Sequence, residues 1–87
     1  MVSKVVFVKN KNGLHMRPAE VLVRLTSQFD SEITLSKDDI RINGKSILGV
    51  MSLAAENGSA ITIEVEGSDE ENAMKSLIEM FSKDLEV

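Results

Sequence analysis

One stretch of the sequence places a nucleophilic side chain where a helix is expected to begin. His15 is the sole histidine and Arg17 follows it by two residues. Pro18 fits only in the first turn of a helix, where its missing N–H is not needed. The sequence therefore predicts a helix that starts near residue 16. Gly13 can adopt φ > 0, so a turn there can present the imidazole to solvent without steric cost.

The chemistry of this arrangement is that of a neutral nucleophile that can hold an anion. Free N–H groups and the positive end of a helix dipole disfavour an imidazolium and favour a bound phosphoryl group. The planar guanidinium of Arg17 can bind two phosphate oxygens at once. Residue types alone leave open a second interpretation, in which His15 is only an N-cap or a surface residue.

A second candidate site precedes a short apolar helix that we expect from residue 47 to about residue 54. Ser46 can be a plain N-cap of this helix, or a phosphorylation site where a dianion meets the helix N-terminus. The helix has too many apolar residues for one buried stripe. Three are expected to point inward: Val50, Leu53 and Ala54. Three would then form an exposed patch that marks a partner site: Ile47, Leu48 and Met51. A helix packed on two sides by the fold is the alternative.

The composition narrows the possible chemistry. The chain has no cysteine and one histidine, which excludes disulfides, thiolate metal sites, a cysteine nucleophile and a zinc site of several imidazoles. No carboxylate pair has the context of a glycosidase dyad, and no glycine-rich phosphate loop precedes a helix. We therefore expect no cofactor, no metal and no self-sufficient hydrolase.

The charge is divided unevenly along the chain. The net charge is −4, which argues against direct nucleic-acid binding. Residues 1–55 hold eight basic side chains and five acids, whereas nine acids face two lysines from residue 56 onward. The first quarter of the chain can thus present a positive surface to an acidic partner or a phosphate. A chance cluster of solvated lysines is the alternative.

No apolar run approaches the roughly 20 residues that cross a bilayer, so we expect no membrane insertion. Residues 1–8 lack a basic leader and the apolar stretch of a signal peptide. The sequence therefore predicts a cytoplasmic protein.

The elements alternate between strand and helix patterns. The predicted strands lie around residues 5–8, 33–35, 40–42 and 61–65, and the second and third bracket a turn at 37–39 as a hairpin. The last strand alternates apolar and polar residues, so one sheet face is expected to be open to solvent. Ser68 and Glu71 predict a capping box for a C-terminal helix of about four turns. Its apolar face is expected to comprise Met74, Leu77, Ile78, Phe81 and Leu85.

These elements predict a single domain over residues 1–87 in the order β-α-β-β-α-β-α. The fold class is α+β: an open-faced two-layer sandwich with a four-stranded antiparallel sheet and three helices on one face.

Two motifs at this spacing give the chain a specific resemblance. They are Gly13-Leu14-His15-Met16-Arg17-Pro18-Ala19 and Gly44-Lys45-Ser46-Ile47-Leu48-Gly49-Val50-Met51-Ser52-Leu53. The chain resembles HPr, the histidine-containing phosphocarrier of the phosphoenolpyruvate-dependent sugar phosphotransferase system, over nearly its whole length. The resemblance implies that His15 takes a phosphoryl group on Nδ1 from enzyme I and passes it to IIA domains of sugar permeases. Arg17 would steady the phosphate.

The resemblance also implies regulation and a partner surface. Ser46 would be the target of an ATP-dependent HPr kinase/phosphorylase, and the phosphorylated form would join a catabolite-control transcription factor in carbon catabolite regulation. Partner binding is expected at six residues: Met16, Arg17, Lys45, Ile47, Leu48 and Met51. Two alternatives remain, a regulatory binding module without covalent chemistry and a paralogue for nitrogen-related phosphorelays. Regulatory homologues without the histidine also resemble this chain, and His15 argues against that class.

Overall fold

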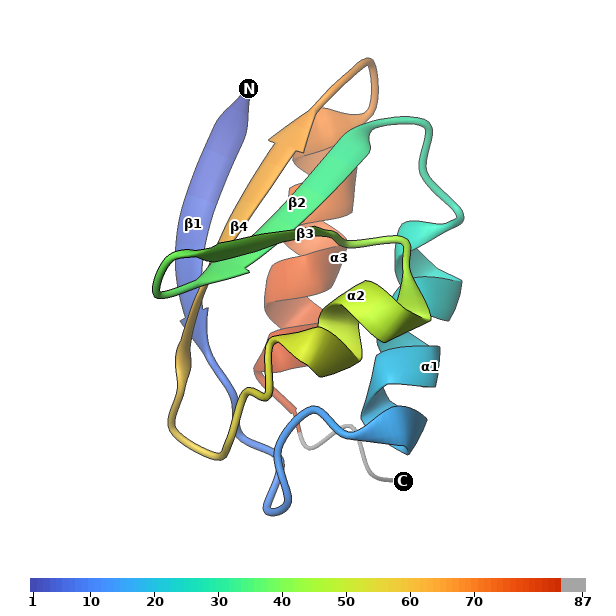
Figure 1. Ribbon diagram of the computed structural model, residues 1–87. Coiled ribbons are helices and arrows are strands. Elements are labelled where there is room, and N and C mark those ends of the chain that lie inside the picture. Colours follow the sequence, from blue (N-terminus) through green and yellow to red (C-terminus); the bar gives the residue numbers. More distant parts are fainter. Residues whose placement is uncertain (84–87) are drawn as a thin grey trace.

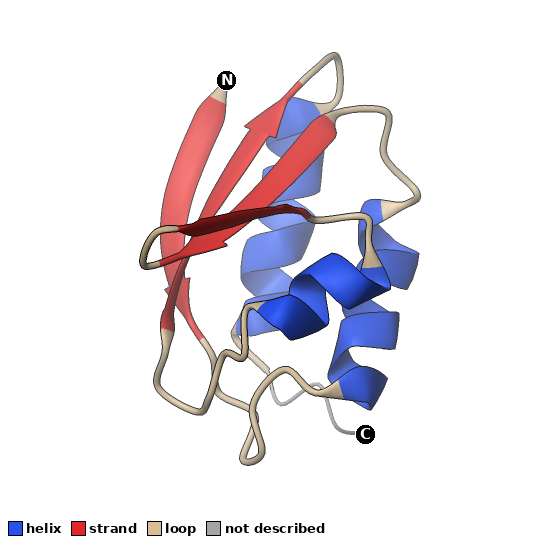
Figure 2. Ribbon diagram, in the orientation of Figure 1, coloured by secondary structure: helices blue, strands red, loops and turns tan. Residues whose placement is uncertain are grey.

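Residues 1–83 are described in this computed structural model, and they show the predicted order of elements. The elements are β1 (Val2–Phe7), α1 (Met16–Thr26), β2 (Glu32–Lys37), β3 (Ile40–Asn43), α2 (Ile47–Ser52), β4 (Ala60–Glu66) and α3 (Glu70–Phe81). The four strands form one sheet in the order β1-β4-β2-β3, and each neighbouring pair is antiparallel. The three helices lie on one side of the sheet, which confirms the predicted open-faced α+β sandwich (Figures 1 and 2).

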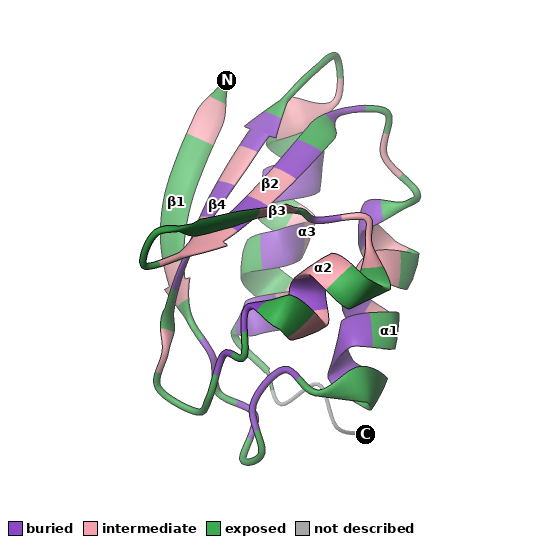
Figure 3. Ribbon diagram, viewed as in Figure 1, coloured by how far each residue is buried: buried purple, intermediate pink, exposed green. Residues whose placement is uncertain are grey.

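The core lies between the sheet and the helices and follows from the periodicity of each element. In β4, Ile61, Ile63 and Val65 are buried whereas the intervening Thr62 and Glu64 are half-buried. Burial also marks a single face of α1 and of α3 (Figure 3). The predicted hairpin is present, and Asp38 takes the left-handed conformation in its turn with φ 55°. The buried faces of the strands and helices determine where the helices pack, and thereby where both candidate sites lie.

The bounds of three elements differ from the prediction. α2 ends at Ser52 rather than near residue 54. β1 starts at Val2, because the whole segment Val2–Phe7 pairs with β4, and Val8 lies buried just beyond it. The described part of the last helix ends at Phe81. The predicted packing of Leu85 lies outside the described residues.

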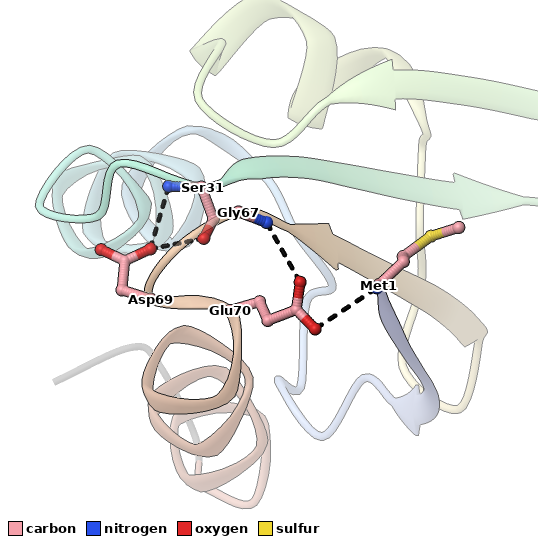
Figure 4. A network of polar contacts seen from close by, with 5 residues as sticks. All are labelled: Met1, Ser31, Gly67, Asp69 and Glu70. Carbon is pink, nitrogen blue, oxygen red and sulfur yellow. Dashed lines mark hydrogen bonds and ion pairs between the residues drawn. The ribbon is translucent and has the colours of Figure 1, made fainter.

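The capping box predicted at Ser68 and Glu71 is wrong. Asp69 is the N-cap of α3, and its carboxylate accepts the N–H of Asp30 at 2.9 Å. It also accepts the N–H of Ser31 at 3.0 Å and the Ser31 hydroxyl (Figure 4). Donors from a distant loop thus fix Asp69, and no serine–glutamate pair begins the helix. The Ser31 hydroxyl, and then the Asp30 N–H, hold the pKa of the Asp69 carboxyl below its ordinary value.

Glu70 supplies a second contact at this end of α3. Its carboxylate accepts the N–H of Gly67 at 3.1 Å and lies 3.3 Å from the amino group of Met1 (Figure 4). The Gly67 N–H is the main cause that lowers the pKa of Glu70, and the positive amino group acts in the same direction. Acidic side chains therefore tie the start of α3 to both the sheet and the loop before β2.

Candidate functional site

His15 is the N-cap of α1, as the sequence predicts. Its backbone is extended, with φ −85° and ψ −164°, and its carbonyl accepts the N–H of Ala19 at 3.0 Å. The residue is exposed, and the imidazole makes no capping hydrogen bond to the helix. A side-chain N-cap role, left open by the residue types, is therefore not what this imidazole performs.

The first turn of α1 favours an anion. Met16 and Arg17 are exposed, whereas Pro18 and Ala19 are buried against the core, so the turn is anchored on one side and open on the other. The first turn contains no acidic residue. The N-terminal N–H groups of the helix and the Arg17 guanidinium can thus act on a phosphoryl group without a competing carboxylate in that turn.

The turn before His15 is held against the loop that follows α2. Gly13 has φ +77° and donates its N–H to the carbonyl of Asn10 at 3.1 Å. Leu14 is 3% exposed and donates its N–H to the carbonyl of Ala55 at 2.9 Å. A Cβ on Gly13 would lie 2.3 Å from that Ala55 oxygen. Glycine is therefore required here by the close approach as well as by the positive φ.

Ser46 is the N-cap of α2, and its hydroxyl accepts the N–H of Gly49 at 3.0 Å. The capping function predicted for this serine is confirmed. The residue is half-buried, and the first turn of α2 contains no acidic residue. Its phosphorylation stays a prediction.

The apolar residues of α2 divide largely as predicted. Val50 and Leu53 are buried, whereas Leu48 is 80% exposed and Ile47 is 38% exposed. Met51 is half-buried and packs against the core, so it belongs to the rim of the patch. We refer to Ile47 and Leu48 together as the α2 patch.

The inward position predicted for Ala54 is wrong. The helix ends at Ser52, so helical spacing no longer applies, and Ala54 is exposed with φ 50°. This is the left-handed residue that commonly follows a helix C-cap, where glycine is preferred. Ala55 is 4% exposed and takes the inward position.

Lys45 makes a contact that the sequence did not reveal. The residue is half-buried, and its ammonium donates to the carbonyl of Phe29 at 2.6 Å. The neighbouring Gly44 carbonyl accepts the buried hydroxyl of Thr26 at 2.7 Å. The segment before Ser46 is thus attached to the C-terminal end of α1. No sequence motif marks such contacts, because the acceptors are backbone carbonyls.

The contact made by Asn57 was also not predicted from the sequence. Its side-chain amide donates to the carbonyl of Asn10 at 3.1 Å, which joins the loop after α2 to the turn before His15.

Within residues 1–83, no group of three or more side chains could hold a metal ion. In the same range, no helix is long and apolar enough to cross a membrane.

Comparison with known proteins assigns the family. A protein-family model described as "PTS HPr component phosphorylation site" matches residues 2–83. This chain belongs to the HPr family. The phosphocarrier protein HPr of Treponema pallidum is 46% identical over 86 residues, which cover 99% of this chain and 98% of that protein.

An HPr-like relative and a solved structure are similarly close. The HPr-like protein Crh of Halalkalibacterium halodurans is 49% identical over 84 residues, covering 97% of this chain and all of that one. The crystal structure of HPr from Bacillus anthracis has a TM-score of 0.88 and 46% identity, and the match covers 92% of this chain and 95% of that chain. The HPr fold is therefore shared along nearly the whole length.

Proposed function

We propose that His15 accepts a phosphoryl group from the phosphohistidine of enzyme I and passes it to a histidine of IIA domains of sugar permeases. The observation that carries this is an exposed histidine at the N-terminus of α1, in a first turn that holds no acidic residue. Nδ1 forms a bond to phosphorus while the P–N bond to the donor imidazole breaks. Each ring keeps its own N–H, so the transfer needs no further proton donor or acceptor.

Arg17 and the start of α1 stabilise the charge on the transferred group. The exposed guanidinium lies two residues after His15, and no carboxylate of the first turn opposes it. Phosphoryl transfer depends mainly on positioning and on electrostatic stabilisation of the equatorial oxygens. The chain holds a phosphoryl group between two partners and needs no cofactor for this step.

The test is phosphorylation of wild type and His15→Ala by enzyme I and phosphoenolpyruvate, followed by mass spectrometry. Wild type should gain one acid-labile phosphate and His15→Ala none. Because His15 is exposed at a helix terminus, the variant should lose at most about 1 kcal/mol of stability. Glu20→Gln, an exposed change in the same helix, is the matched control and should be phosphorylated like wild type. An equal acid-labile phosphate on His15→Ala would overturn the assignment.

We further propose that Ser46 is phosphorylated by an ATP-dependent HPr kinase/phosphorylase and that this form binds a catabolite-control transcription factor. Support comes from the position of Ser46 at the start of α2, directly before the exposed α2 patch. A phosphate there would change the charge of a surface suited to protein contact. A histidine phosphoramidate is labile whereas a serine phosphate ester persists, which fits one site to transfer and the other to regulation. The cytoplasmic location stays a prediction.

A second candidate is a regulatory protein that binds partners without phosphoryl transfer. The similarity to the HPr-like protein Crh favours it, since that relative covers 97% of this chain. The experiment with enzyme I and phosphoenolpyruvate separates the two functions. A regulatory module would gain no acid-labile phosphate, whereas a carrier would gain it at His15.

A further inference from the structure

The loop after α2 is joined to the turn before His15 by a side chain as well as by the backbone. Asn57 donates its amide N–H to the carbonyl of Asn10 at 3.1 Å. The same carbonyl accepts the N–H of Gly13 at 3.1 Å. One backbone oxygen therefore takes two donors, one from each loop, as its two lone pairs allow.

Asn10 lies in the interior beneath this turn. The residue is 2% exposed, and its own side-chain nitrogen has no hydrogen-bond partner among the described residues. The amide of Asn10 therefore does not donate to hold the turn. Its carbonyl does so, through Gly13 on one side and Asn57 on the other.

We propose that Asn57 is a positioning residue for phosphoryl transfer at His15, an inference that rests on the proposed carrier function. Its amide fixes the carbonyl that closes the turn from Asn10 to Gly13, and the chain reaches His15 two residues later. Buried Leu14 lies between, so a displacement of the turn is passed to the start of α1.

The expected size of the effect follows from the reaction and from the bond. Transfer between two imidazoles requires the attacking nitrogen, phosphorus and leaving nitrogen to lie nearly in line, and a misplacement of about 1 Å can cost about 100-fold. Loss of one neutral hydrogen bond changes a local equilibrium by about five-fold. In Asn57→Asp a carboxylate oxygen would replace the donor and face the Asn10 carbonyl. Phosphoryl transfer to this variant should therefore be slowed by about five-fold or more.

The experiment measures single-turnover transfer from phosphorylated enzyme I to wild type, Asn57→Asp and Asn57→Gln over a range of carrier concentrations. The rate constant at saturation should fall about five-fold or more in Asn57→Asp, while the half-saturating concentration stays within about two-fold of wild type. Asn57→Gln keeps an amide donor and should recover most of the rate. Asn72→Asp makes the same chemical change on an exposed position of α3 and should match wild type.

A second measurement tests the hydrogen bond itself. The Gly13 amide shares its acceptor with Asn57, so its NMR resonance should move in Asn57→Asp and stay in place in Asn72→Asp. An unmoved Gly13 resonance would overturn the proposal.

Three kinetic results would also overturn it: an unchanged saturating rate in Asn57→Asp, a change in half-saturation alone, or equal slowing by Asn72→Asp. Failure of the carrier function itself looks different, because wild type would then acquire no phosphate at all.

Discussion

The N-cap of α2 gives a prediction in which stability and regulation can be separated. Ser46→Ala removes the hydroxyl oxygen that accepts the Gly49 N–H at 3.0 Å. Loss of such a cap costs about 1 kcal/mol, which lowers Tm by roughly 4–8 °C in a domain of this size. Ser46→Asp keeps an acceptor and adds a negative charge at a first turn that holds no acid, a gain of about 0.3–1 kcal/mol. Its Tm should equal or exceed that of wild type.

Thermal unfolding of the three proteins, followed by circular dichroism at neutral pH, measures this order. If Ser46→Ala unfolds at the same temperature as wild type, the hydroxyl contributes nothing to α2 and the reasoning fails. A Tm for Ser46→Asp below that of Ser46→Ala would refute the electrostatic part, because the charge would then destabilise the helix N-terminus.

The same variants should behave in the opposite order in phosphoryl transfer. A negative charge beside the α2 patch would be desolvated on docking and would repel acidic groups of enzyme I. Enzyme I-dependent phosphorylation should therefore be slower for Ser46→Asp than for Ser46→Ala, and added salt should narrow the difference. Ser68→Asp, an exposed change before α3, controls for net charge. Equal rates for the aspartate and alanine variants at low salt would show that the electrostatic account is wrong.

Three further predictions concern the α2 patch, the start of α1 and the start of α3. Leu48→Ala should change the free energy of unfolding by less than about 0.5 kcal/mol, since Leu48 is 80% exposed, but should weaken enzyme I binding with little salt dependence. Arg17→Glu should instead lower the rate of association with enzyme I, and added salt should reduce this effect. Normal enzyme I binding by Leu48→Ala would show that the α2 patch is not a contact surface. Hydrogen bonds from Ser31 and Asp30 lower the pKa of Asp69 in the folded protein. The ionised carboxylate therefore stabilises the fold above about pH 4, the ordinary pKa of an unfolded chain, and this contribution is lost as pH falls through the lowered pKa of the folded state. In denaturant unfolding over a pH series, the free energy of unfolding of Asp69→Asn should fall less steeply at acidic pH than that of wild type. An equal fall in both proteins would argue against the Asp69 contact.

Local patterns were sufficient to predict most of the fold. Alternation in β4, a proline in the first turn of α1 and a serine before α2 each specify local structure without reference to distant residues. The same patterns placed His15 and Ser46 at helix N-termini. Both candidate sites could therefore be predicted from the sequence, because each depends on where a helix begins.

The features that the sequence did not predict depend mainly on contacts between segments far apart in the chain. Ser68 and Asp69 are both acceptable caps by residue type, and the donors of Asp30 and Ser31 decide between them. Ala54 was misplaced because the helix ends two residues before it. Lys45 and Asn57 bond to backbone carbonyls 16 and 47 residues away, and any residue type supplies such an acceptor.

The two sites lie at opposite ends of α1, and this separation limits how Ser46 can influence His15. His15 occupies the N-cap position of α1, whereas the segment before Ser46 is bonded to Thr26 and Phe29 at the far end of that helix. The helix has 11 residues, so the sites are roughly 16 Å apart along it. At that distance two unit charges in water interact by only about 0.3 kcal/mol, and salt screens most of this.

A direct effect of a Ser46 charge on the phosphohistidine is therefore too weak to inhibit transfer. We therefore expect inhibition to act through docking, at the exposed α2 patch that follows Ser46. The spontaneous loss of phosphate from His15 should accordingly proceed at the same rate in wild type and Ser46→Asp, even where transfer from enzyme I is slowed. A faster or slower loss in the variant would show that the two sites communicate through the protein itself.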